Sequence, residues 1–124
     1  MLSQLGVGTD IEMVSRFSEI RAKDDRFLNS FMTNKEIEYC FSKESPIPHI
    51  AARFAAKEAV IKALGSLSIR GVSYKDIEIA NDMHGTPSAT IRPETKLNID
   101  VKISLSHSAE NAIAVAVAVK EELE

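Results

Sequence analysis

Four charged side chains stand within one alanine-rich stretch of the sequence: Arg53, Lys57, Glu58 and Lys62. The stretch is composed of good helix formers, and it predicts a helix over residues 49–64 with Gly65 as a left-handed C-terminal cap. Its surface is small or apolar nearly all round, with Ile50, Phe54 and Ile61 as a stripe, which is typical of a buried helix. Because charges inside a protein need partners, these four side chains are candidates for chemistry.

Carboxylates also follow the β-favouring run at residues 5–11. Asp10 and Glu12 are two positions apart, so in a strand both would lie on one face, where a hard divalent cation could take oxygen ligands. Ordinary explanations stay open for these groups. Asp10 or Glu12 could stabilise the start of a following helix, and Glu58 with Lys62 could form a surface i,i+4 pair worth roughly 0.3–0.5 kcal/mol.

Taken together, these charges have the composition of a phosphoryl-transfer site. Asp10 and Glu58 would share one Mg²⁺. The positive charge for phosphate oxygens would come from Arg53, Lys57 and Lys62.

Other metal and nucleotide sites are disfavoured. His49, His84 and His107 share no zinc-ligand spacing, so any metal is expected to be bound by oxygen. A lone histidine such as His107 is more often structural than catalytic. Residues 6–8 are too short for a dinucleotide fingerprint, and no phosphate-binding loop is present. Cys40 is the only cysteine, which excludes an intramolecular disulfide and favours a cytoplasmic setting.

Composition predicts an ordinary globular protein. The 124 residues are 44% hydrophobic and 27% charged, which suits a single domain spanning residues 1–124. The net charge of −3 argues against non-specific binding of nucleic acid. The longest apolar run, residues 112–119, is far short of the ~20 residues that cross a bilayer, so no membrane contact is expected.

The remaining patterns predict helices first and mostly antiparallel strands later, an α+β fold. Helical spacing is present at residues 13–21, and Thr33 with Glu36 forms a capping box for a helix over residues 34–43. Prolines then break that helix, and Pro48 is suited to the first turn of the next. Strand patterns follow at residues 77–79, 89–91, 101–105 and 112–119, the first two as a hairpin around the turn formers of residues 81–87.

Three segments carry a family resemblance: GVGTDIEMVSRF at residues 6–17, RFAAKEAVIKALG at 53–65 and ISLSHS at 103–108. DIEIAND at residues 76–82, with Gly85 and Pro87, adds a fourth. In order and spacing they resemble the holo-acyl-carrier-protein synthases, which are short 4′-phosphopantetheinyl transferases. The resemblance implies that family's fold, with helices packed on a mostly antiparallel sheet. It also implies Mg²⁺-dependent transfer of the phosphopantetheine arm of coenzyme A to a serine of apo acyl carrier protein, releasing adenosine 3′,5′-bisphosphate, in fatty acid and lipid biosynthesis.

Site roles follow from the same resemblance. Asp10 and Glu58 match the family's Mg²⁺ ligands, with Glu12 contributing through water, and Glu58 and Lys62 match its catalytic residues. The positions that match coenzyme A contacts are Arg53, Lys57, Lys62, Gly85, Pro87 and His107. The basic side chains expected to dock the carrier protein are Arg16, Arg21, Lys23 and Arg26, which could equally form an ordinary solvated face. Thr86 and Leu67 depart from family usage, so the adenosine-side contacts are the least secure.

The strand at residues 112–119 also bears on assembly. It alternates alanine with isoleucine or valine, which leaves neither face polar. Self-association would cover the second face, and the resemblance implies a homotrimer with active sites between subunits, although sequence alone permits a dimer or a monomer. Two other functions remain open: a module that binds coenzyme A without chemistry, and a structural protein, which would leave the helix charges without purpose.

Overall fold

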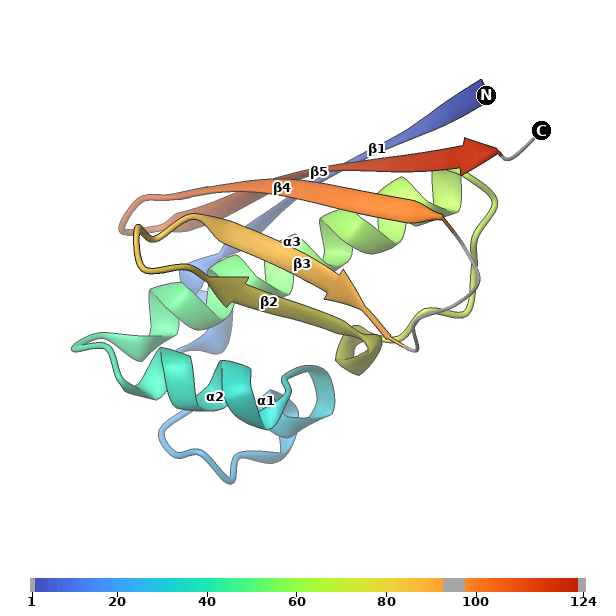
Figure 1. Cartoon of the computed structure of the whole chain (residues 1–124). Helices are drawn as coiled ribbons and strands as arrows, with labels where there is room; N and C mark the ends of the chain where they lie inside the picture. Colours follow the sequence, from blue (N-terminus) through green and yellow to red (C-terminus); the bar gives the residue numbers. More distant parts are fainter. Residues whose placement is uncertain (1, 93–97, 123–124) are drawn as a thin grey trace.

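A three-stranded antiparallel sheet lies along one side of a long helix, and a two-stranded sheet and two short helices lie around its other sides (Figure 1). The structure is a computed structural model that describes residues 2–92 and 98–122. The larger sheet has the order β1 (Leu2–Met13), β5 (Asn111–Glu122) and β4 (Ile99–His107). The smaller sheet pairs β2 (Ile77–Asn81) with β3 (Pro87–Ile91), also antiparallel. The fold is therefore α+β, with helices packed on antiparallel strands, as predicted.

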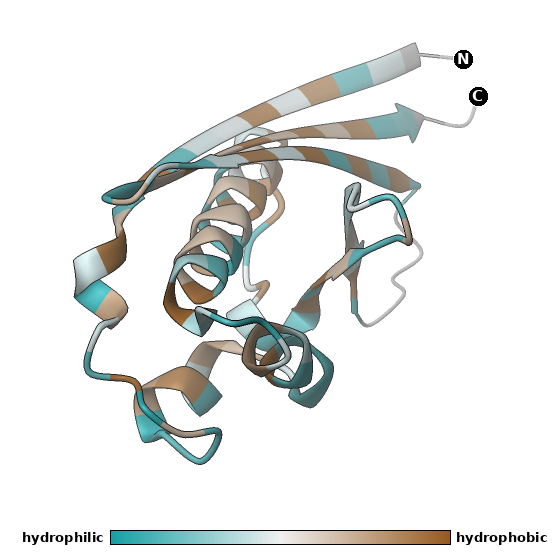
Figure 2. Ribbon diagram, turned by 90° about the vertical axis from the view of Figure 1, so that its left-hand side faces the viewer, coloured by the Kyte–Doolittle hydropathy of each residue, from teal (hydrophilic) through white to brown (hydrophobic). Residues whose placement is uncertain are grey.

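The helices follow the first strand. A 3₁₀ turn, η1 (Val14–Phe17), continues β1, and α1 (Arg26–Phe31), α2 (Asn34–Phe41) and α3 (Pro46–Ser66) follow in turn. A second 3₁₀ turn, η2 (Tyr74–Asp76), leads into β2. In Figure 2, α3 runs between the three-stranded sheet and the short helices. Its small and apolar surface is buried by these neighbours, which confirms the prediction of a buried helix.

Glycine and alanine allow the sheet to lie directly on α3. A Cβ atom on Gly8 would stand 1.9 Å from the Ala59 carbonyl oxygen, and one on Gly6 would stand 2.1 Å from the Ala63 oxygen. Any larger side chain would force β1 and α3 apart. The inward face of β5 is alanine at every alternate position, all fully buried: Ala112, Ala114, Ala116 and Ala118. This close approach brings the carboxylates at the end of β1 next to the charges of α3.

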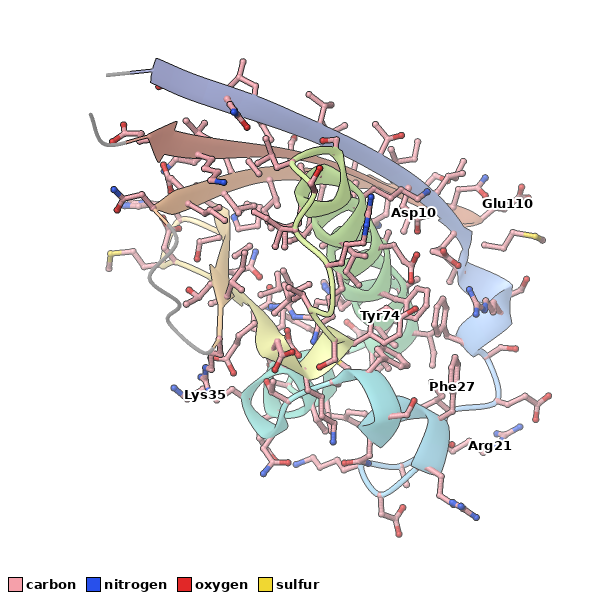
Figure 3. The ribbon with its side chains drawn as sticks, turned by 90° about the vertical axis from the view of Figure 1, so that its right-hand side faces the viewer. Asp10, Arg21, Phe27, Lys35, Tyr74 and Glu110 are labelled. Carbon is pink, nitrogen blue, oxygen red and sulfur yellow. The ribbon has the colours of Figure 1, made fainter. Side chains whose placement is uncertain are left out.

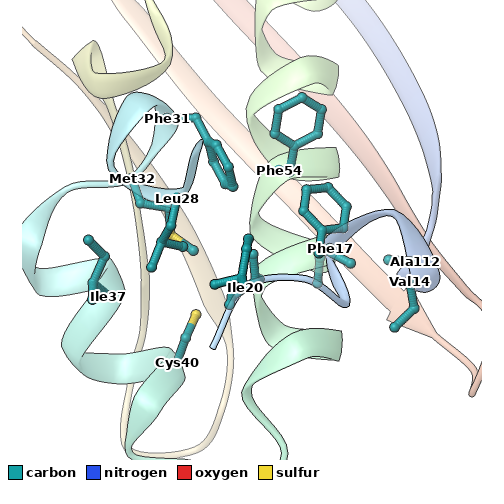
Figure 4. Close-up of a cluster of buried hydrophobic side chains, with 13 residues drawn as sticks. Val14, Phe17, Ile20, Leu28, Phe31, Met32, Ile37, Cys40, Phe54 and Ala112 are labelled. Atoms are coloured by element: carbon teal, nitrogen blue, oxygen red, sulfur yellow. The ribbon is translucent and has the colours of Figure 1, made fainter. Parts of the chain in front are cut away.

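The core has two clusters along α3. The first surrounds the first half of the helix, where Phe17, Phe31 and Phe54 meet with ring centroids 5.0–6.0 Å apart (Figure 4). The second surrounds the later turns and contains Ala114, Ala116 and Ala118 of β5 with Ile77 and Ile79 of β2. Each cluster joins elements from distant parts of the sequence, so α3 is the axis on which the site is built.

The capping box, the hairpin and the last strand pair are confirmed. Thr33 Oγ1 accepts from the Glu36 amide and Glu36 Oε1 accepts from the Thr33 amide, at the start of α2. β2 and β3 enclose the predicted turn, where Gly85 has φ +83°. β4 pairs with β5 around the polar stretch, with His107 opposite Ala112.

Three expectations about helices are wrong. Residues 13–21 form only the single turn of η1, because β1 keeps pairing with β5 as far as Met13 and the core contacts of Phe17 and Ile20 need no further helix. The helix that does follow, α1, begins at Arg26 and is capped by Asp25, whose side chain accepts from the Leu28 amide. The helix predicted over residues 49–64 starts three residues earlier, since α3 begins at Pro46, although Pro48 does lie in its first turn.

The third correction concerns the end of α3. Gly65 lies inside the helix, and Ser68 is the residue in the left-handed conformation, with φ 62°. The amides of Ser68 and Ile69 donate to Gly65 and Leu64, which is a Schellman closure. The burial of Leu67 carries the chain one turn past the glycine, an effect of packing that the local sequence does not show.

Candidate active site

Each of the four charges on α3 finds a partner on another element. Lys62 contacts β1, Glu58 contacts Tyr74 of η2, Lys57 contacts Glu36 of α2, and Arg53 contacts Asn81 of β2. The alternative of an i,i+4 pair between Glu58 and Lys62 is therefore not observed, because both side chains make contacts across the fold. Of the four, only Lys62 contacts a carboxylate of β1 within the described residues, whereas Glu58, Lys57 and Arg53 contact η2, α2 and β2.

The contact between Lys62 and β1 places a cation beside a nearly buried carboxylate. Lys62 Nζ donates to the Thr9 carbonyl oxygen at 3.0 Å and stands 3.4 Å from Asp10 Oδ1. The Asp10 side chain is 11% exposed, whereas that of Lys62 is 53% exposed. Burial, reinforced by the neighbouring Glu12 carboxylate, raises the pKa of Asp10 to about 6, against the lowering effect of Lys62. Asp10 thus lies in surroundings that disfavour its charge unless further positive charge is present.

Glu58 and Glu12 belong to the same neighbourhood. Glu58 lies one helical turn before Lys62, and its Oε1 accepts a hydrogen bond from the Tyr74 hydroxyl. That hydroxyl also lies within electrostatic range of Glu12 and Arg16, which pair with each other at 2.7 Å. Asp10 on β1 and Tyr74 are both labelled in Figure 3. The end of β1 therefore carries two neighbouring carboxylates, Asp10 and Glu12, and Tyr74 lies between the surroundings of Glu12 and Glu58 of α3.

The Asp10 carboxylate suits a hard cation. Asp10 Oδ2 is buried and has no hydrogen-bond partner within the described residues, so one carboxylate oxygen is available as a ligand. Residues 2–92 and 98–122 contain no group of three or more His, Cys, Asp or Glu side chains arranged around one point. Mg²⁺ commonly takes one or two protein carboxylates and completes its octahedron with water and substrate phosphate. Asp10 of β1 and Glu58 of α3 lie on elements that pack directly on each other, so they are the candidates for such a pair of ligands.

The alternative role of Asp10 and Glu12 as helix caps is not observed. Met13 occupies the N-cap of η1, the turn receives no side-chain capping bond, and its first turn contains no acidic residue. The side chain of Glu12 instead contacts Arg16.

Arg53 faces the β2–β3 hairpin. Its Nη2 donates to Asn81 Oδ1 at 2.7 Å, and Asn81 Nδ2 donates to the Gly85 carbonyl oxygen at 3.0 Å. The guanidinium also lies 4.0 Å from the centroid of the Tyr39 ring. Although Arg53 is only 2% exposed, its Nε has no partner among the described groups. The structure thus connects Arg53 with Gly85, and Pro87 begins β3 just beyond this turn.

His107 ends β4 and meets a second histidine. The His107 and His49 rings are 5.9 Å apart, and His49 in turn lies 6.1 Å from Tyr39. Burial lowers the pKa of His49, and the positive charges of His107, Lys43 and Arg53 lower it further. This corner of the molecule is rich in cationic groups and lies at the opposite end of α3 from Lys62.

Lys57 is not available to a phosphate in this structure. Its side chain is fully buried, and its ammonium donates to Glu36 Oε1 at 2.7 Å, the Phe31 carbonyl at 2.7 Å and the Tyr74 carbonyl at 2.9 Å. These three acceptors use all three donors of an ammonium group. Burial lowers the pKa of Lys57, and Glu36 opposes that shift. Lys57 therefore holds α1, α2 and η2 together, in contrast to the phosphate contact that the resemblance implies.

The basic residues near the start of the chain differ in their surroundings. The Arg16 guanidinium is paired with Glu12 and lies 4.8 Å from the Phe54 ring centroid. Lys23 pairs with Glu38 at 3.0 Å, with both side chains more than half exposed. Arg26 begins α1, and Arg21 is exposed in the loop before it (Figure 3). The four residues thus lie on η1, α1 and the loop between them, instead of on one helix.

The outer face of the three-stranded sheet is apolar and open in this single chain. β1 and β5 are antiparallel neighbours in register, with Val7 opposite Val117 and Ile11 opposite Ile113. The large side chains of this face include Leu5, Val7, Ile11, Met13, Ile113 and Val115, which are 38–66% exposed. The predicted division of β5 into an alanine face and a face of larger apolar residues is confirmed.

Two partners of the site were missed by sequence reasoning. Tyr74 lies in a segment without helical or strand periodicity, and Glu36 was assigned only to the capping box. Glu36 also accepts from Lys57 and from the Ile79 amide, at 2.7 Å each. Both contacts join elements that are distant in the sequence, so they become visible only in the structure. The sequence did offer one indication, because a buried Lys57 requires an acidic partner.

Comparisons with known proteins show the family to which this fold belongs. The family model described as the 4′-phosphopantetheinyl transferase superfamily matches residues 6–118. The chain is 47% identical over 114 residues to the holo-[acyl-carrier-protein] synthase of Chlamydia caviae, covering 90% of this chain and 93% of the relative. It is 42% identical over 123 residues to the corresponding enzyme of a Thermoanaerobacter species, covering 94% and 88%.

A solved structure agrees. The holo-(acyl-carrier-protein) synthase of Bacillus anthracis, determined in complex with coenzyme A, superimposes with a TM-score of 0.77 at 33% identity, covering 94% of this chain and 96% of that one. The chain therefore belongs to the holo-acyl-carrier-protein synthase family of 4′-phosphopantetheinyl transferases. Among the described helices, none has the length and continuous apolar character that a membrane crossing requires.

Proposed function

We propose that this protein transfers the 4′-phosphopantetheine arm of coenzyme A to a serine of an apo acyl carrier protein, with Mg²⁺. The serine oxygen forms a bond to the phosphorus next to the pantetheine, the bond to the bridging oxygen breaks, and adenosine 3′,5′-bisphosphate leaves. One observation carries the proposal: Asp10 Oδ2 is buried without a hydrogen-bond partner among the described residues, while Oδ1 of the same carboxylate lies 3.4 Å from the ammonium of Lys62, a residue one helical turn from Glu58. In this role the protein serves fatty acid and lipid biosynthesis, in the cytoplasm as the single cysteine suggests.

The site residues divide the work. Asp10 and Glu58 are the candidate Mg²⁺ ligands, with Glu12 near enough to act through water, and the ion would neutralise charge on the pyrophosphate. Lys62 is exposed enough to reach a phosphate and already touches Asp10, so it is suited to stabilise the leaving group or to assist proton transfer. Lys57 supports them from inside the core.

Arg53, His107, Gly85 and Pro87 are the candidate contacts for coenzyme A. Support comes from the hydrogen bonds that connect Arg53 with the hairpin through Asn81, and from the excess of positive charge around His107. Anionic phosphates suit such a corner, because the described groups there contribute cations and aromatic rings.

The carrier protein is expected to dock on the basic side chains of η1, α1 and the loop between them, Arg16, Arg21 and Arg26. Of these, Arg16 already pairs with Glu12, which lies two residues from Asp10, so a carrier bound to Arg16 would approach the metal ligands. This adjacency supports a docking surface next to the reacting groups.

We also propose a homotrimer with active sites between subunits. The exposed apolar face of β1 and β5 needs a cover, and a second and third copy of the chain would supply it. Size exclusion with light scattering measures the mass directly, and Val7→Asp is expected to produce monomers with lower activity. A monomeric wild type with full activity at assay concentration would contradict the shared-site arrangement.

The transfer reaction is tested with coenzyme A, Mg²⁺ and an apo carrier protein, followed by intact mass spectrometry for one added phosphopantetheine. Asp10→Ala and Glu58→Ala are expected to abolish the mass gain while the fold remains intact by circular dichroism. Coenzyme A binding without any mass gain in the wild type would favour the alternative of a binding module, and normal transfer by either variant would remove its residue from the metal site.

A further inference from the structure

Tyr74 is held at three points in the structure. Its hydroxyl donates to Glu58 Oε1, its ring tilts against Phe54 with centroids 5.3 Å apart, and its carbonyl oxygen accepts from Lys57 Nζ at 2.9 Å. The turn that carries it is closed by Asp76, whose Oδ2 accepts from the amide and the hydroxyl of Ser73 at 2.9 Å each. A residue with this many restraints has a fixed position.

The restraints come from two adjacent residues of α3. Lys57 holds the main chain of Tyr74, and Glu58 receives the tyrosine hydroxyl. Lys57 is itself fixed by Glu36 and by the Phe31 carbonyl, both at 2.7 Å. The position of the hydroxyl relative to Glu58 is therefore set by the buried core, and it does not depend on the solvent-exposed end of the site.

Glu58 needs such a restraint. A glutamate has three rotatable side-chain bonds, and a metal site requires its ligands to be held near one geometry. The hydrogen bond occupies Oε1, and the described residues offer no further hydrogen bond to the Glu58 carboxylate, so Oε2 is left for a ligand. The direction of this bond is fixed, because a phenolic hydroxyl can donate whereas a carboxylate only accepts.

We propose that Tyr74 is a positioning residue for Glu58. The Tyr74 hydroxyl holds one oxygen of the Glu58 carboxylate, so that the other oxygen is free to bind the cation. This inference rests on the proposed function, which makes Glu58 a Mg²⁺ ligand. It adds Tyr74 to the candidate metal site through a hydrogen bond. It also gives buried Lys57 a role beside Glu58, because Lys57 anchors the main chain of Tyr74, and Tyr74 orients Glu58.

The test is Tyr74→Phe, which keeps the ring on Phe54 and removes the hydroxyl. Mg²⁺ is titrated by calorimetry into enzyme saturated with coenzyme A in the absence of carrier protein. We expect the Mg²⁺ affinity to fall about tenfold, as is typical when a hydrogen-bond partner of a metal ligand is removed. In steady-state transfer we expect kcat to fall by a similar factor while KM for coenzyme A changes less than about twofold.

Ser73→Ala is the matched control, because it removes one hydroxyl from the same turn without touching Glu58. It is expected to keep wild-type Mg²⁺ affinity and kcat. The double variant Tyr74→Phe/Glu58→Gln should bind Mg²⁺ no more weakly than Glu58→Gln alone, since the hydroxyl acts through that carboxylate.

The outcomes separate this inference from the function on which it rests. If Glu58→Gln loses Mg²⁺ affinity and transfer while Tyr74→Phe loses neither, Tyr74 has no positioning role and the proposed function stands. If Glu58→Gln keeps both, Glu58 is no metal ligand, and both assignments fall. An equal loss in Ser73→Ala and Tyr74→Phe would show a general effect of the turn and would overturn the role of the hydroxyl.

Discussion

Lys57 and Lys62 belong to the same helix, yet their ammonium groups have opposite surroundings. The Lys57 side chain has no exposed surface, and its three donors bind protein oxygens at 2.7–2.9 Å. The Lys62 side chain is 53% exposed and makes looser contacts with β1, at 3.0 and 3.4 Å. One ammonium is saturated by the fold, whereas the other keeps room for a ligand.

The difference shows what each kind of charge is used for. A buried pair gains stability only if every donor and acceptor is satisfied, so its residues cannot also bind a substrate. The half-exposed Lys62 contributes little to the free energy of folding, because water screens its pair with Asp10. Its side chain can still turn toward a negative charge that develops during a reaction. Lys57 fixes the elements around the candidate site, whereas Lys62 remains accessible, as its proposed role in the reaction requires.

The largest expected effect comes from breaking the saturated pair. Lys57→Met should lower the free energy of unfolding by about 3–5 kcal/mol, because Glu36 would be left as a buried charge without its partner. Urea denaturation at neutral pH measures this change.

The double variant Lys57→Met/Glu36→Gln is the control for that measurement. It removes the unpaired charge while keeping an acceptor for the Thr33 amide, so it should be more stable than Lys57→Met alone. If the double variant instead lost as much stability as Lys57→Met and Glu36→Gln lose together, the two residues would not act as a coupled pair.

The sequence predicted elements correctly where the pattern lies in neighbouring residues, and less well where contacts between distant residues set the boundary. The capping box at Thr33, the hairpin and the alternation in β5 are read from neighbouring residues, and all three are present. The end of α3 and the turn after β1 are decided by burial of Leu67 and by pairing of Met13 with Asn111. Those contacts join distant or buried groups, so local propensity placed the boundaries wrongly.

The candidate site was predictable only in part. The family motif and the charges of α3 located the site, but the motif makes no distinction between Lys57 and Lys62, which differ in burial. Tyr74 carried no signal in the sequence, since its role depends on a hydrogen bond to a helix that lies earlier in the chain. Residue types predict the chemistry of a site, whereas the partners that orient it require the three-dimensional arrangement.

An intermediate effect is expected from the exposed lysine. Lys62→Met should reduce kcat by roughly 10²-fold, if its charge acts mainly on the leaving phosphate, while coenzyme A affinity changes little. Its unfolding free energy should change by less than about 1 kcal/mol, because an exposed pair contributes little. Lys62→Arg, which retains the charge, is the control and should recover part of kcat. Equal losses in kcat and in coenzyme A affinity would make Lys62 a binding contact only.

The smallest effect extends the comparison to a cation that has no partner among the described residues. Arg21 is exposed, and the described residues offer it no ion pair or hydrogen bond, whereas Lys23 nearby is paired with Glu38. An unpaired surface charge mostly affects the encounter with a charged partner. Arg21→Glu should therefore raise KM for an acidic carrier protein by about three- to tenfold, an effect that shrinks at high salt, with coenzyme A affinity unchanged. The control is Arg70→Glu, which makes the same charge change at an exposed residue in the loop after α3, away from η1 and α1. It should leave the KM for carrier protein as in the wild type. Equal effects of the two variants would mean that net charge alone steers the carrier, and no change in either would return Arg21 to an ordinary solvated surface.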